Sequence, residues 1–165
     1  MCVEHKKMCV CGRNSAGFQF RDEIMPEEIL EKLYCPICSA GVQHEEGTMI
    51  RDNGWIIKYD MDVVHLMQQK LPVAEATPAY LFDEGYCTWD GLYPGDRADS
   101  IREREELVLL AKKDKKEYIE RFKSWGIRRM NRLAKEGWRK ADETRQGKQP
   151  LHHTEHAGAA IHDLS

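Results

Sequence analysis

The sequence has no apolar run that approaches the roughly 18 residues needed to span a bilayer, which argues against an integral membrane protein. Its basic start, residues 1–7, has no apolar stretch behind it, so it lacks the features of a secretory signal. We therefore expect a cytoplasmic protein with no membrane association. In that compartment thiols stay reduced, and paired cysteines more often indicate metal or redox chemistry than disulfides.

Several common catalytic motifs are also missing. There is no glycine-rich phosphate loop, no serine nucleophile elbow and no histidine pair with the spacing of zinc proteases. Residues 80–96 offer Asp83, Glu84, Asp90 and Asp96 as acid/base candidates, but their spacing does not pair two carboxylates. The sequence therefore argues against an enzyme.

What the sequence does contain is a group of closely spaced cysteines. Cys9 and Cys11 are followed, after 23 residues, by Cys35 and Cys38. Two close pairs separated by a short insertion suit a tetrahedral four-thiolate site, because each pair forms a tight turn that presents two thiolates. Gly12 fits this chemistry, since a residue just after the second ligand often needs a positive φ to aim N–H groups at sulfur. The spacing predicts one metal site made by these four cysteines.

These two turns resemble those of zinc-ribbon and rubredoxin-like small metal domains, over residues 8–42. The second turn, Cys-Pro-x-Cys, matches closely. The first has one residue between its cysteines instead of two, and no glycine directly follows Cys38, which counts against a true rubredoxin. The expected ion is therefore Zn²⁺, with iron as the alternative. Because four protein sulfurs close the site, it is structural or electron-transferring, and it lacks the open position of a Lewis-acid catalyst.

Local patterns predict short elements around this site. Residues 18–20 alternate like a strand, and Pro26 with its acidic neighbours predicts a short helix that runs to Cys35. Asn53-Gly54 predicts a type I′ hairpin between residues 48–50 and 55–59. A helix from Met61 to about Lys70 follows, capped by Asp60 or Asp62, with His65 on its core side.

The rest of the chain is expected to be a connection, a helical arm and a tail. Residues 73–99 are rich in turn signals and aromatics, and we expect an ordered loop lying against another element. Residues 100–145 show helical periodicity that begins at a capping box on Ser100 and breaks near Trp125-Gly126. The tail contains His152, His153 and His156, whose spacing suits adventitious metal binding.

These elements predict an α+β fold with four regions. Residues 1–72 form a metal-knuckle and β-hairpin domain, and residues 73–99 an ordered aromatic and acidic connection. Residues 100–147 form a basic amphipathic helical arm, and residues 148–165 a flexible, histidine-containing tail. Cys2 and Cys87 stay outside the site, Cys2 as a terminal residue and Cys87 as a small buried one.

Charge is divided unevenly along the chain. Residues 21–99 carry 6 basic against 16 acidic residues, and residues 100–148 carry 16 basic against 9 acidic. Such opposed blocks indicate intramolecular docking or two different partner surfaces. Either the helical arm pairs with the acidic middle of its own chain, or it binds an acidic protein or phosphate backbone. The candidate partner-binding residues are Trp125, Arg128, Arg129, Arg132, Trp138 and Arg139.

The leading functional hypothesis is a small cytoplasmic structural-zinc accessory or interaction protein, such as a small subunit of a larger enzyme complex. Its partner would be a larger protein. One alternative is a rubredoxin-like iron–sulfur electron carrier. Another is a nucleic-acid-binding zinc ribbon that uses the basic C-terminal helix.

Overall fold

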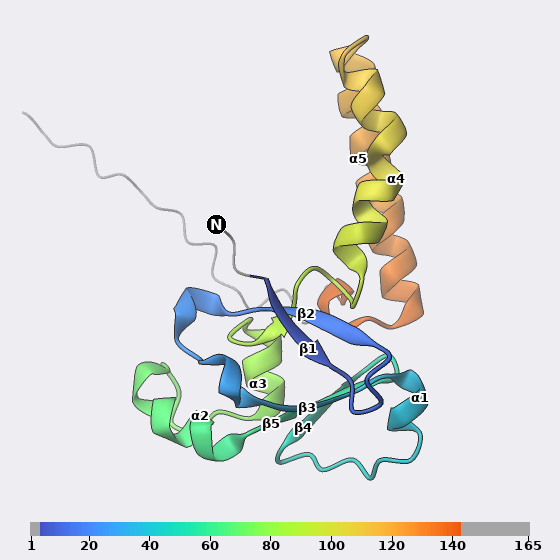
Figure 1. Cartoon of the computed structure of the whole chain (residues 1–165). Helices are drawn as coiled ribbons and strands as arrows, with labels where there is room; N and C mark the ends of the chain where they lie inside the picture. Colours follow the sequence, from blue (N-terminus) through green and yellow to red (C-terminus); the bar gives the residue numbers. More distant parts are fainter. Residues whose placement is uncertain (1–3, 143–165) are drawn as a thin grey trace, which may run out of the picture.

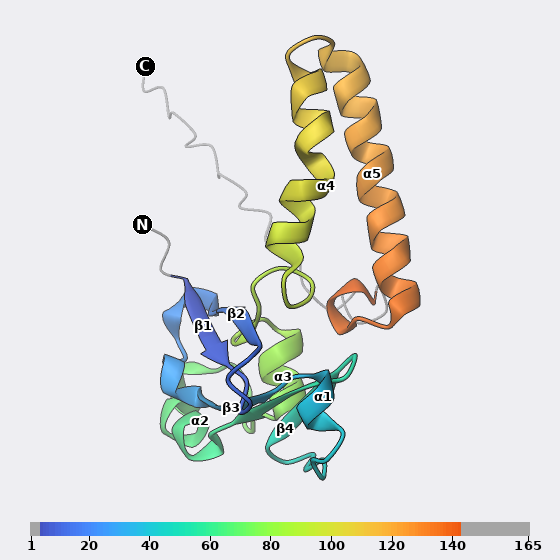
Figure 2. The ribbon, with the colours of Figure 1, turned by 45° about the vertical axis from the view of Figure 1, so that its right-hand side comes forward.

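The computed structural model describes residues 4–142, and its helices and sheets agree with the α+β prediction (Figure 1). A β-rich part holds six short strands and several short helices. From it projects a hairpin of two long helices, α4 (Asp96–Ala111) and α5 (Lys115–Glu136), which run side by side in both ribbon views (Figure 2). Among residues 4–142, no helix combines the length and the apolar character needed to cross a membrane.

The first sheet joins distant parts of the sequence. Strands β1 (His5–Met8) and β2 (Ser15–Gln19) form an antiparallel pair, and β6 (Thr88–Trp89) pairs with the other edge of β2. The strand expected at residues 18–20 therefore exists but starts earlier, at Ser15. The β2–β6 pairing makes the segment after residue 73 part of the central fold.

The second sheet has the order β3–β5–β4, with β3 (Leu30–Tyr34), β5 (Trp55–Tyr59) and β4 (Met49–Asp52) all antiparallel. The hairpin prediction is confirmed, because Asn53 and Gly54 both have positive φ, at 47° and 88°. The helix expected from Pro26 to Cys35 is wrong: a single turn of 3₁₀ helix, η2 (Glu27–Ile29), leads directly into β3. The apolar residues Ile29, Leu30 and Leu33 fit one face of a helix as well as they fit a strand. The segment forms a strand because it pairs with an edge of β5 that would otherwise be free.

Short helices complete the β-rich part. Asp60 caps α2 (Met61–Met67) by accepting hydrogen bonds from two backbone N–H groups, as expected. His65 is exposed, which corrects the expectation of a core histidine. The remaining short elements are α1 (Pro36–Ser39), α3 (Pro78–Asp83) and the 3₁₀ turns η1 (Arg21–Glu23), η3 (Gln68–Lys70) and η4 (Arg139–Ala141).

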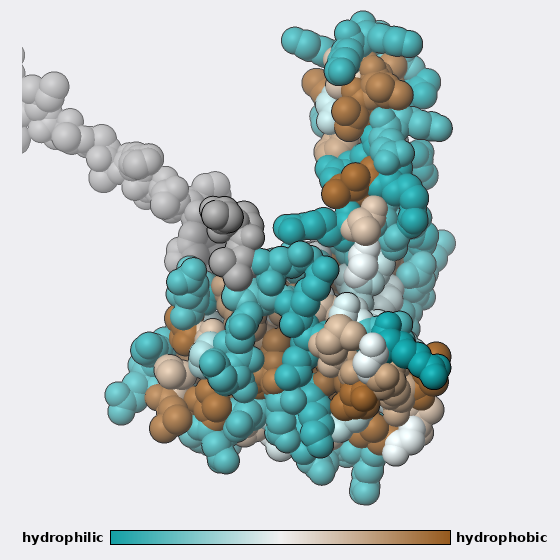
Figure 3. All heavy atoms as spheres, in the orientation of Figure 1, coloured by the Kyte–Doolittle hydropathy of each residue, from teal (hydrophilic) through white to brown (hydrophobic). Residues whose placement is uncertain are grey.

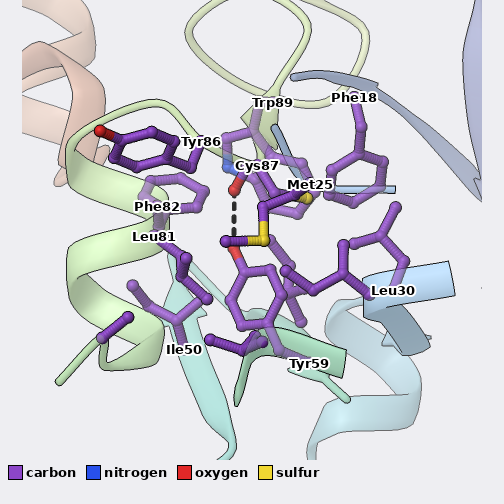
Figure 4. Packing of buried hydrophobic residues seen from close by; sticks show 14 of the residues in the cluster. Phe18, Met25, Leu30, Ile50, Tyr59, Leu81, Phe82, Tyr86, Cys87 and Trp89 are labelled. Atoms are coloured by element: carbon purple, nitrogen blue, oxygen red, sulfur yellow. Dashed lines mark hydrogen bonds between the residues drawn. The ribbon is translucent and has the colours of Figure 1, made fainter. Parts of the chain in front are cut away.

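The hydrophobic core lies between the two sheets and α3 (Figure 4). Trp89 is fully buried and its ring contacts those of Phe18 and Phe82. The Tyr59 hydroxyl donates to the backbone carbonyl of Cys87 at 2.7 Å, which satisfies the one polar atom of that buried ring. The aromatic residues after position 73 were expected in an ordered loop lying against another element, and three of them, Phe82, Tyr86 and Trp89, belong to the core itself.

The long helices begin and end at places that differ from the sequence prediction. Helix α4 begins at Asp96 rather than at Ser100. The break expected at Trp125-Gly126 is wrong, because α5 passes through Gly126 and the turn lies at residues 112–114. Asp114 caps α5 through the N–H of Glu117, and Gly137 ends it with φ 93°. The cap and the left-handed glycine set the ends of α5, since a lone helical glycine costs only about 1 kcal/mol.

Candidate metal centre

The first cysteine pair lies in the turn between β1 and β2. Cys9 follows β1 directly, and its N–H donates to the carbonyl of Asn14, which closes the turn at 2.7 Å. Gly12 donates to the carbonyl of Cys9 at 2.8 Å and has φ 71°, as expected for the residue after this pair. The turn buries Cys9 and leaves Cys11 exposed.

The second cysteine pair lies where β3 passes into α1. Cys35 is buried at the N-cap position of α1, and Pro36 occupies the first turn of that helix. The N–H of Ser39 donates to the carbonyl of Cys35 at 2.8 Å, which fixes the single turn that carries Cys38. A strand end and a short helix therefore present two sulfurs from one rigid segment.

A direct contact between β1 and β3 brings the two pairs together. Cys9 and Leu33 form a parallel bridge, and the N–H of Val10 donates to the carbonyl of Leu33 at 3.0 Å. The N–H of Cys35 donates to the sulfur of Cys9 at 3.1 Å. The backbone thus places the pairs against each other before any ion is considered.

The four sulfurs of Cys9, Cys11, Cys35 and Cys38 all lie within 4.8 Å of one another. Zinc–sulfur bonds of about 2.3 Å in a tetrahedron put neighbouring sulfurs about 3.8 Å apart. The cluster fits such an ion with only small side-chain adjustments. The four cysteines are therefore placed to bind a metal ion.

Backbone N–H groups already favour the thiolate form at two of these sulfurs. Hydrogen bonds from the backbone of Arg13 lower the pKa of Cys11, and those from the backbone of Cys38 lower the pKa of Cys35 to about 6. The hydrogen bond with Cys9 raises the pKa of Cys38 to about 12. Four crowded sulfurs thus compete for protons, and a divalent cation resolves this competition because it favours the thiolate at every position.

The remaining cysteines lie outside this cluster. Cys87 is buried in the core, and burial raises the pKa of its thiol well above the ordinary value. Its environment is that of a small packing residue, as expected, because low-pKa reactive cysteines need polar or cationic neighbours. Cys2 and the histidines of the tail lie outside the described residues.

The expected partner-binding residues lie on the long helices, and several of them contact acidic groups of the same chain. The half-buried Arg129 pairs with the buried Asp96, and the more exposed Arg132 pairs with Glu103; both pairs join α5 to α4. The Trp125 ring N–H donates to Glu103 at 3.0 Å. Arg128 is exposed. Within this set, intramolecular pairing accounts for Arg129 and Arg132, whereas Arg128 faces solvent.

Trp138 and Arg139 lie at the joint between α5 and the β-rich part. Trp138 stacks on Tyr93, with ring centroids 5.3 Å apart. Arg139 makes a two-pronged contact with Asp83, whose oxygens lie 2.8 and 3.2 Å from its guanidinium nitrogens. Asp83, Asp90 and Asp96, three of the four acid/base candidates in residues 80–96, form ion pairs with arginines of the same chain.

Two further residues hold this joint together, and one of them, Asp52, was not singled out from the sequence. Asp52 is buried at the end of β4 and accepts hydrogen bonds from the Trp89 ring N–H at 2.7 Å and the backbone N–H of Arg139 at 3.0 Å. The ammonium of Lys140 donates to the carbonyls of Trp89 and Gly91, and burial lowers its pKa to about 8. The only signal in the sequence was that Asp52 precedes the turn pair Asn53-Gly54, a common place for a turn-forming aspartate.

No protein-family model, no curated protein and no solved structure matches this chain. The cysteine geometry therefore shows a cluster that can bind a metal ion, and the zinc-ribbon resemblance stays a prediction.

Proposed function

We propose that this protein is a small cytoplasmic structural-zinc accessory protein whose helical arm, residues 96–136, docks onto a larger protein partner. One observation carries the proposal: none of residues 97–132 is buried. The arm therefore exposes side chains over its whole length beyond the base.

The metal centre supports a structural role. Cys9, Cys11, Cys35 and Cys38 would hold the ion, and a four-thiolate site leaves no coordination position for substrate or water. The site lies where β1, β3 and α1 meet, so a bound ion ties together segments that are distant in sequence. Zinc suits this role better than iron, because a structural site needs no redox chemistry.

The apolar surface of the arm supports a protein partner. Among the described residues, nine large apolar side chains are exposed, and five of them lie on the arm: Ile101, Val108, Leu109, Ile119 and Ile127. In Figure 3, hydrophobic patches are visible on the projecting helices, and others lie on the β-rich part. Most helical stability in proteins comes from packing of an apolar face, and these two helices bury little by themselves. A partner that covers the arm would supply the missing packing.

Capture from the native host tests this proposal. The tagged protein is compared with Ile101→Glu and Ile119→Glu, which place a charge on the arm, and with Leu66→Glu as the matched control. Leu66 is 78% exposed on α2, outside the arm. We expect the same larger protein to copurify with the wild type and Leu66→Glu and to be lost from both arm variants. Identical copurifying proteins from all four would overturn the proposal.

Nucleic-acid binding is a second candidate, favoured by the charge of α5, which carries 8 basic against 3 acidic residues. Phosphate contacts would make such binding steeply salt-dependent. Retention on generic DNA or RNA at low salt, lost at high salt and weakened in Arg128→Glu, would support it. No retention at low salt would remove it.

A further inference from the structure

We propose that one face of the arm binds the same face of a second copy, so that two arms form a four-helix bundle. The face is the groove between α4 and α5. The inference rests on the proposed function in taking the arm as a docking element. Ile101 and Ile119 do not line this groove. Their exposed side chains, assigned above to the larger partner, therefore lie outside the self-association contact.

The groove is an open depression with a mixed lining. Its volume is about 620 Å³, and it combines the apolar side chains of Leu107, Leu109, Leu110 and Trp125 with five charged side chains. Leu109 is 63% exposed at its edge, and the other three are half-buried. A groove between two helices is a common binding site for another helix. With this mixed lining, its occupant must supply apolar and charged side chains together.

The charges at the groove select that occupant. Glu106 on α4 and Arg128 on α5 both line the groove, and neither forms an ion pair with any residue of 4–142. One side of the groove thus offers an unpaired carboxylate, and the other an unpaired guanidinium. The whole of α4 is acidic, with 5 acidic against 3 basic residues, whereas α5 is basic.

A second copy related by a two-fold axis satisfies both sides at once. A two-fold axis that runs parallel to the arm, along the open side of the groove, places α4 of one copy against α5 of the other, in antiparallel directions. Glu106 of each copy then faces Arg128 of its mate, and the apolar residues of the two linings cover each other. The groove is complementary to itself, and this favours a second copy over a helix of uniform charge.

The test is the mass of the zinc-loaded full chain in solution, measured by light scattering over a wide range of concentrations. One chain has a mass of 19.2 kDa, so a dimer has about twice this value. We expect the dimer mass at high concentration and a reversible shift toward one chain on dilution. A single-chain mass at every concentration would overturn the inference, and so would a mass that grows without limit.

Substitutions test whether this groove is the contact. We expect Leu109→Glu to raise the dimer dissociation constant roughly tenfold or more, because it places an unpaired charge in the apolar contact. Leu66→Glu, the control outside the arm, should dimerise like the wild type. Zinc content and circular dichroism should match the wild type in both, since each site is exposed in the single chain. Unchanged dimerisation of Leu109→Glu would contradict the assignment.

A charge reversal tests the pairing of α4 with α5. Glu106→Arg should weaken the dimer, because the arginine introduced in one copy would then face Arg128 of the other copy, and the two positive charges repel. Adding Arg128→Glu to the same chain should restore it, because the pair is re-formed with opposite polarity. A double variant as weak as the single one would contradict the two-fold arrangement. These outcomes are separate from partner capture, which depends on Ile101 and Ile119.

Discussion

The β-rich part and the helical arm of this chain bury their side chains in opposite ways. Every buried apolar residue of the described chain lies within residues 9–89, apart from Leu133 and Ala141 near the base of the arm. The arm beyond its base buries none. One part thus has a core of its own and four cysteines placed to bind a metal ion, whereas the other keeps its side chains at least partly exposed. On our proposal a partner covers these exposed side chains.

The joint between the two parts is polar and specific. Asp52 links the β4–β5 hairpin to Trp89 and to the chain after α5, and Arg139 holds Asp83 on α3. A buried, hydrogen-bonded carboxylate such as that of Asp52 fixes one arrangement, because any other leaves it unpaired. The arm is therefore held at its base by specific polar contacts. Along its length, α4 and α5 contact each other, but their side chains stay exposed or half-buried.

The largest expected effect is at the metal centre. Cys35→Ser removes a buried ligand, and we expect it to unfold residues 5–59, because apparent binding energies of structural zinc, about 10–16 kcal/mol, are also folding energy. Near-ultraviolet circular dichroism and thermal unfolding measure this loss. Cys87→Ala is the matched control, a buried cysteine outside the cluster, and should cost about 1–2 kcal/mol while zinc content is retained. Equal losses of stability in the two variants would contradict a role for Cys35 beyond that of an ordinary buried cysteine.

The next effect concerns two arginines that lie three residues apart on α5. Arg129→Ala leaves Asp96 buried without its partner and should cost about 3 kcal/mol of unfolding free energy. Arg132→Ala breaks the exposed pair with Glu103 and should cost less than about 1 kcal/mol. The side chains are 11% and 6% exposed in the first pair, against 48% and 30% in the second. Denaturant unfolding measures both, and similar costs would show that the base of the arm is no more tightly held than its length.

A smaller effect is a pH dependence at the joint. The pKa of Lys140 falls from 10.5 to about 8 on folding, so the unfolded chain binds more protons between these values. Stability should therefore rise with pH, by about 2 kcal/mol between pH 7 and 9.5. Lys140→Met should remove this part of the slope. Parallel pH profiles for the two proteins would contradict a buried ammonium at the joint.

The smallest effect compares two glycines of α5, one in the middle of the helix and one at its C-terminal end. Gly126 lies inside α5, and an added Cβ would meet nothing within 4 Å, so Gly126→Ala should stabilise the chain by up to about 1 kcal/mol. Gly137 ends α5 with φ 93°, so Gly137→Ala should destabilise it by about 1 kcal/mol. Thermal unfolding of the two variants should move in opposite directions. Shifts of the same sign would place the end of α5 elsewhere.

The sequence predicted those features that depend on local chemistry. The spacing of the four cysteines, the positive φ at Gly12, the turn at Asn53-Gly54 and the cap at Asp60 all follow from short-range rules, and the structure confirms them. Each needs only a few neighbouring residues. For the same reason the metal cluster was predictable without knowledge of the fold.

Features that depend on tertiary pairing were missed. Leu30–Tyr34 became a strand because β5 offered a free edge, and Trp89 became a core residue because β6 pairs with β2. Asp52 gained its role from Trp89 and Arg139, which lie 37 and 87 residues away. No local pattern indicates such contacts. The unburied length of the arm was also invisible, since helical periodicity predicts a packing face and does not show what covers it.

The most direct test of this account is metal analysis of the protein purified without added metal, carried out for the wild type and for Cys35→Ser. The account predicts a colourless wild-type protein with one zinc per chain, and a variant that retains no zinc. Visible absorption with stoichiometric iron would contradict the structural-zinc assignment, and equal metal content in the two proteins would contradict the four-cysteine site itself.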